Sequence, residues 1–218
     1  MRGFIPSALA AALLAGAACG SGGPVGVSLN MPGIAVLPPG SFSEIVVTDF
    51  ADAAPPPDLA PGLELPNYLA AEIGRVFAGP VSRATVPAEA AARPAPPSFW
   101  KEKGVGHEGA VFLTGTVNLT GAVRKAVDRV VPLDRLFDAS RGGLIEQLRW
   151  TMAVDVCLVS AATGEVLHRT SLREYRDYNE LDKPVEFAFS DLSDRIRARL
   201  FPALLGTPTI ERRALLRR

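Results

Sequence analysis

Three runs of apolar, β-branched residues constrain the fold of this 218-residue chain more than any other feature. They span residues 44–50, 110–119 and 150–160, and each has the length and composition of a buried strand. A Gly-containing turn at 162–165 and a further run at 166–178 predict that the third strand continues into a β-hairpin. Neither set of alternate residues in 166–178 is cleanly apolar, which predicts a strand near an edge or at an exposed face.

Helical periodicity appears in two further segments. Residues 68–77 place Leu69, Ile73, Val76 and Phe77 on one face, and residues 185–200 do the same with Phe189, Leu192, Ile196 and Leu200. Residues 81–86 predict a short strand, and 98–103 predict one or two helical turns. Clustered prolines predict loops over 51–66 and 87–97, and Pro202 is expected to break or kink the last helix.

This order of elements predicts an α/β (α+β) fold, in which two main helices pack on a single mixed β-sheet. The domain is expected to cover residues 41–206, about the size at which one chain builds a real core. Lys and Arg together number 23, and so do Asp and Glu. Such a balance gives no electrostatic reason to expect nucleic acid as a partner.

The N-terminus has the features of a secretory signal peptide over residues 1–18. Arg2 supplies the early positive charge, and residues 8–18 are an apolar run too short to span a bilayer. Cys19 follows directly, and residues 19–40, rich in Gly and Pro, are expected to form a flexible linker. Residues 207–218 are expected to form a basic C-terminal tail. The other cysteine, Cys157, lies in a predicted strand and is expected to be a small core residue.

The segment 14–19 (LAGAAC) resembles the lipobox of bacterial lipoproteins, in which the cysteine is acylated and becomes the new N-terminus. The resemblance implies lipidation of Cys19 by acyl chains such as palmitate. Gly20, where an aspartate would retain the protein, is similar to the signal for passage to the outer membrane. Two alternatives stay open: an ordinary signal peptide cut at a nearby alanine, and a disulfide between Cys19 and Cys157.

No catalytic constellation is found in the sequence. His107 and His168 form no group with metal-ligand spacing, and no phosphate-binding loop follows a strand, so neither metal nor cofactor is expected. Ser98 and Lys101 fit the Ser-x-x-Lys nucleophile pattern, but its companion motifs are missing. An aromatic turn anchored by its neighbouring rings explains that segment more simply. Asp49 ends a buried strand and either is a poised carboxylate or fixes the next loop.

Three motifs together resemble a known family. They are residues 45–50 (IVVTDF), 112–117 (FLTGTV), and 155–159 (DVCLV) with its turn 162–167 (ATGEVL). In this order they resemble periplasmic lipoproteins of the curli-secretion and penicillin-binding-protein-activator type, whose domain is similar to the amino-terminal domain of TolB. The resemblance covers about residues 44–205. It implies a binding or scaffolding module, with no catalytic residues to carry over.

The leading hypothesis is therefore a non-enzymatic lipoprotein of the outer membrane, facing the periplasm. Its partners would be other cell-envelope proteins, and the membrane through its acyl chains; the oligomeric state is left open. A second hypothesis is lipid or glycan binding in a pocket lined by Phe99, Trp100, Phe187 or Phe189. A third is a serine hydrolase that uses Ser98 and Lys101.

Overall fold

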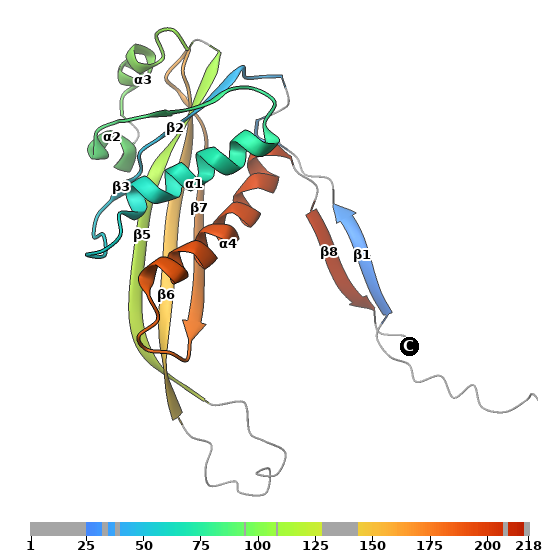
Figure 1. Ribbon diagram of the computed structural model, residues 1–218. Coiled ribbons are helices and arrows are strands. Elements are labelled where there is room, and N and C mark those ends of the chain that lie inside the picture. The colour runs from blue at the N-terminus through green and yellow to red at the C-terminus, as the bar shows by residue number, and fades with distance from the viewer. Residues whose placement is uncertain are drawn as a thin grey trace, which may run out of the picture. The chain divides into compact units, whose positions relative to one another are not determined.

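A computed structural model describes residues 25–31, 35–37, 40–93, 95–107, 109–127, 144–206 and 209–215 (Figure 1). The chain divides into two compact units. The smaller unit contains a two-stranded sheet of β1 (Val25–Met31) and β8 (Thr209–Leu215). These strands fall within the segments expected to be linker and tail. The expected signal peptide and Cys19 lie outside the described residues.

The larger unit, Pro32–Thr209, is built on one mixed sheet. Its strands are β2 (Glu44–Thr48), β3 (Ala51–Asp52), β4 (Val81–Ala84), β5 (Ala110–Val127), β6 (Leu144–Ser160) and β7 (Val166–Tyr178). The order is β4-β2-β5-β6-β7, and β3 pairs with β5. The pairs β4–β2 and β2–β5 are parallel, whereas β5–β6 and β6–β7 are antiparallel. This confirms the predicted α/β class with a mixed sheet.

Four helices cover the sheet unevenly. α1 (Pro61–Val76) and α4 (Val185–Leu205) pack on one face, where they bury an apolar layer with alternate residues of the strands (Figure 1). The short helices α2 (Ala88–Ala92) and α3 (Pro97–Lys103) form a smaller cluster on the other face with Val46, Phe112 and Val159. None of the described helices is long and apolar enough to cross a membrane.

Helix α1 begins earlier than the sequence pattern predicts. Residues 61–66 were expected to be loop because of their prolines, but the helix starts at Pro61, a position where the missing N–H costs nothing. Pro66 lies inside the helix and has no N–H to donate to the carbonyl of Gly62, four residues back. The Phe50 N–H donates to that carbonyl at 2.9 Å instead. A hydrogen bond from the segment between β2 and β3 therefore compensates for the proline.

One further loop prediction is wrong, and the last helix continues past the proline that was expected to break or kink it. Residues 88–92 lie in the expected loop 87–97 but form α2, because this alanine-rich stretch is a good helix former with Ala90 and Ala91 buried. Helix α4 continues past Pro202 to Leu205, since Phe201 and Leu204 pack into the main core. Its last carbonyls are satisfied from outside the helix: Val36 N–H donates to Ala203 O, and Leu37 N–H to Leu204 O.

The close approach at Gly62 gives a prediction about stability. A Cβ atom at this position would lie 2.5 Å from the carbonyl oxygen of Phe50, so Gly62→Ala forces the helix start away from the sheet. We expect a loss of about 1–3 kcal/mol in the free energy of unfolding, measured by urea denaturation. Gly74→Ala is the matched control, because Gly74 lies in the same helix with nothing within 4 Å of its Cβ position. It should be stabilising by about 0.5–1 kcal/mol, and equal effects of the two substitutions would contradict this account.

Candidate functional site

The sheet face opposite α1 and α4 is open over much of β5, β6 and β7. Near the start of β5 this face is closed by α2 and α3, which pack on Phe112 and on Val159, its cross-strand partner. Beyond the short helices, the residues of β5, β6 and β7 that point to the same side of the sheet as Phe112 and Val159 are uncovered. This open face consists of Thr116, Asn118, Thr120, Arg149, Thr151, Ala153, Asp155, Arg169, Ser171, Arg173, Tyr175 and Asp177. It is almost entirely polar.

Arg149 and Asp177 form the strongest polar contact on the open face. The Nε and Nη2 atoms of Arg149 each donate to a carboxylate oxygen of Asp177 at 2.6 Å, a two-pronged contact between directly opposed residues of β6 and β7. The guanidinium carbon lies 3.9 Å from the centre of the Tyr175 ring. The hydrogen bond from Arg149 is the main cause that lowers the pKa of Asp177. These contacts fix the tyrosine and the ion pair as one unit.

A second contact chain crosses the open face on Asp155 of β6. Ser171 of β7 donates its hydroxyl to one carboxylate oxygen of Asp155, and Thr116 of β5 donates to the other at 3.5 Å. The three residues are directly opposed across the three strands. Arg169 and Arg173 flank them on β7. Arg169 lies opposite Cys157 and interacts with its thiol, and within the described part of the chain neither arginine has a carboxylate partner. The open face therefore offers two cations without carboxylate partners beside hydroxyl and amide groups.

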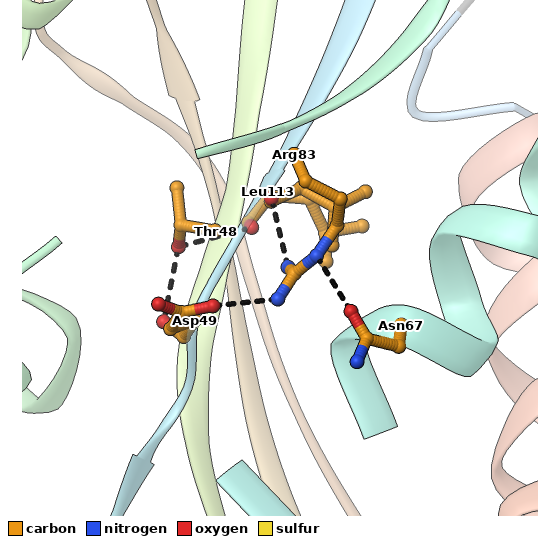
Figure 2. A network of polar contacts seen from close by, with 6 residues as sticks. Thr48, Asp49, Asn67, Arg83 and Leu113 are labelled. Atoms are coloured by element: carbon orange, nitrogen blue, oxygen red, sulfur yellow. Dashed lines mark hydrogen bonds and ion pairs between the residues drawn. The ribbon is translucent and has the colours of Figure 1, made fainter. Parts of the chain in front are cut away.

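Another polar network lies at the carboxyl end of β2, between β4 and helix α1 (Figure 2). Arg83 of β4 donates to Asp49 Oδ1 at 2.5 Å, to Val47 O at 2.9 Å and to Asn67 Oδ1 of α1 at 3.1 Å. Ligands of open α/β sheets often bind at this end of the strands. Here Asp49 and Arg83 are largely occupied by each other and by the surrounding chain. The structure thus favours the second option for Asp49, a carboxylate that fixes the chain after its strand.

The opposite end of the same strands holds a cluster that the sequence analysis did not identify. Glu44 of β2 accepts hydrogen bonds from Ser82 of β4 at 2.5 Å and contacts His107 Nδ1 at 2.6 Å. The hydrogen bond from Ser82 is the main cause that lowers the pKa of Glu44. Because the three residues are far apart in the chain, no local motif indicates the cluster. The carboxylate lies between the serine and the histidine, so it is not arranged as a nucleophile and its base.

The remaining displaced pKa values have structural causes. Burial, followed by a hydrogen bond to Asp194, raises the pKa of Tyr68 to about 12. Burial is also the main cause that raises the pKa of Cys157, a free and buried thiol on β6. Such a thiol stays protonated and inaccessible, as expected for a core cysteine. Among the residues that the structure describes, no group of His, Cys, Asp and Glu side chains could hold a metal ion.

The residues of the two alternative hypotheses do not come together in one site. Phe99 and Trp100 pack with Phe112 in the smaller cluster, whereas Phe189 packs against the main core on the other face. Phe187 is 54% exposed and lies against Tyr178. Ser98 lies at the start of α3 and Lys101 one turn later, both exposed, and no hydrogen bond joins them in this described helix. His168 lies on β7, far along the chain from His107.

The ion pair on the open face gives a prediction about pH. Because the pKa of Asp177 is lowered in the folded state, the pair stabilises the fold at neutral pH, and this contribution is lost as pH falls through 3.8 and below. A double-mutant cycle of Arg149→Gln and Asp177→Asn should give a coupling of about 1 kcal/mol at pH 7, measured by urea denaturation. The pair Lys183–Glu180, whose carboxylate is 67% exposed, is the control and should couple more weakly. A coupling between Arg149 and Asp177 that persists in acid would contradict this interpretation.

No protein-family model matches the chain, and a search of curated proteins gives no match either. Three solved structures illustrate what the fold is similar to. The PelC dodecamer from Paraburkholderia phytofirmans is 12% identical, with 84% of this chain and 99% of that chain covered at a TM-score of 0.45. A neuraminyllactose-binding hemagglutinin homolog from Helicobacter pylori is 11% identical, with 77% and 84% covered at a TM-score of 0.44. Lipoprotein GNA1162 from Neisseria meningitidis is 11% identical, with 72% and 97% covered at a TM-score of 0.33.

Proposed function

We propose that this chain is a lipoprotein of the outer membrane whose α/β domain binds another cell-envelope protein in the periplasm. Acyl chains on Cys19 hold it at the membrane, and the open face makes the contact. The domain itself carries out no chemistry. In this proposal the protein works through its location and its surface, in the assembly, transport or regulation of an envelope complex.

The observation that carries the proposal is the open face itself. When helices cover one face of a sheet, the other face needs a cover only where its own residues are apolar. Here the uncovered part carries hydroxyl, amide and charged groups on three neighbouring strands, with Arg169 and Arg173 free of ion pairs in the described chain. These groups favour a partner surface with acidic side chains, since opposite charges across an interface speed and orient association.

The polar groups elsewhere in the larger unit favour a binding role over catalysis. Asp49 is held by Arg83, Glu44 by Ser82 and His107, and the thiol of Cys157 is buried. Active sites place titratable groups with shifted pKa values in a cleft where a substrate can reach them. In the described part of this chain the shifted groups are instead explained by burial or by partners within the fold.

Anchoring supplies the affinity that such a surface needs. A domain held near a membrane meets other membrane-held proteins at an effective concentration on the order of mM. More than one acyl chain is needed for a lasting anchor, at about 0.8 kcal/mol for each buried CH₂ group. The Cys19 context resembles the sequence at which such chains are attached. Membrane attachment and partner binding are therefore expected to depend on each other in cells.

A photo-crosslinking amino acid at position 118 tests both parts. Asn118 is exposed on the open face, so the native chain should crosslink to an envelope protein in intact cells, detected as a shifted band and identified by mass spectrometry. The same probe at Arg75, on the exposed side of α1, should give much weaker crosslinking. Cys19→Ala should release the chain from membranes and reduce the crosslink strongly. Cys157→Ala, which removes the buried thiol, should leave the chain in the membrane fraction.

Two results would overturn the proposal in different ways. A chain that remains in the membrane fraction after Cys19→Ala would refute the acyl anchor. Equal crosslinking from positions 118 and 75 would refute the open face as the binding surface.

A further inference from the structure

The outer edge of β7 is a free sheet edge of thirteen residues. In the part of the chain that the structure describes, β7 pairs only with β6 and ends the strand order of the sheet. The strand at the opposite end, β4, has only four residues. A long edge strand presents a row of backbone donors and acceptors that another strand can take up. The side chains of β7 decide which strand can pair with this edge.

The sequence of β7 limits how it could pair with itself. In an antiparallel pair, residues directly opposite each other share a face of the sheet, so a symmetric pair must be centred on one residue. Centring the pair on Arg173, Glu174 or Arg176 places two like charges directly opposite each other, which is destabilising. Centring it on Leu172 leaves Arg173 and Glu174 opposite the uncharged residues Ser171 and Thr170.

A pair centred on Tyr175 is different. It places Glu174 of each copy opposite Arg176 of the other, and Arg173 of each copy opposite Asp177 of the other. All four charged contacts are then attractive. Each face of one sheet continues into the same face of the other. Leu172 lies opposite Tyr178, so the remaining contact is apolar. Among the registers centred on residues 172–176, this one alone makes every charged residue of the central segment meet its opposite.

We propose that two copies of this chain associate through antiparallel pairing of residues 172–178 of β7, with Tyr175 at the two-fold axis. Pairing in this way satisfies the free backbone edge and joins the two sheets into one. The open faces of both copies then lie on the same side of the joined sheet. The proposal is independent of the membrane anchor and of any envelope partner.

The surroundings of the edge decide which of these contacts matter most. Within one copy Glu174 already contacts Arg199 and Arg176 contacts Asp191, both on α4, so the pairing between copies depends mainly on Arg173 and Asp177. Arg173 is exposed and has no ion pair within the described chain, so it is free to meet a carboxylate of the second copy. Asp177 already accepts two hydrogen bonds from Arg149, but an ionised carboxylate has further acceptor sites. A hollow of about 410 Å³, lined by Glu174, Tyr175, Arg176, Asp177 and Arg195, lies along this edge. Tyr175, 52% exposed, would be covered at the axis.

Charge exchange between copies tests the register. The full chain in detergent solution should sediment as a dimer whose population rises with concentration. Arg173→Glu alone places two acidic groups opposite each other, and Asp177→Arg alone places two basic groups together, so each variant should sediment as a monomer. Mixed in equal amounts, the two variants should form dimers again, because every opposed pair is then attractive. Arg169→Glu, on the same face of β7 but outside the paired segment, should leave the dimer intact.

A cysteine at the axis provides a second measurement that does not alter charge. Opposed residues have Cβ atoms about 4.5–5.5 Å apart, close to the separation in a disulfide, so Tyr175→Cys should give a covalent dimer on mild oxidation. Ser171→Cys is the matched control, since in this register the two copies of residue 171 lie about 27 Å apart. A monomeric native chain, a mixture that fails to dimerise, equal crosslinking of both cysteine variants, or crosslinking to a different protein would each overturn the proposal.

Discussion

The apolar layer beneath α1 and α4 is the interaction on which the rest of the larger unit depends. Alternate residues of β2, β5 and β6 point into it, and the buried stripes of both helices complete it. Because side chains alternate along a strand, every apolar residue on this side fixes a neighbour on the other side. The apolar layer therefore also determines which residues make up the open face.

The other face is closed only in part, and the short helices explain why. α2 and α3 cover Phe112 and Val159 near one end of the sheet, but β5 and β6 run on for many residues beyond them. In the extended part, the side chains opposite the apolar layer change from Phe and Val to Thr, Asn, Asp and Arg. The change in residue type coincides with the end of the helical cover. This agreement indicates that the polar face is stable in contact with solvent or with a polar partner.

The elements that could be predicted from the sequence are those with a local cause. The β-branched runs at 44–50, 110–119 and 150–160, the hairpin, and the helices around Leu69 and Leu192 all appear where periodicity placed them. The start of α1 could not be predicted, because Pro66 lies inside the helix and the carbonyl that it leaves free accepts a hydrogen bond from Phe50, a residue distant in the chain. The Arg83–Asp49 and Glu44–His107 contacts join residues that are 34 and 63 positions apart in the sequence. No local sequence pattern indicates a contact between residues so far apart. The open face likewise became visible only once the register of β5, β6 and β7 was known.

Cysteine reactivity along β5 tests the central claim, that the open face is the working surface of this protein. In the purified chain, Asn118→Cys and Thr120→Cys should react rapidly with a charged maleimide, whereas Leu119→Cys should react slowly because Leu119 is 2% exposed in the apolar layer. In native membranes the two rapid positions should become shielded, and the unsubstituted chain gives the background. Equal reactivity of positions 118 and 120 in membranes and in solution would contradict the account.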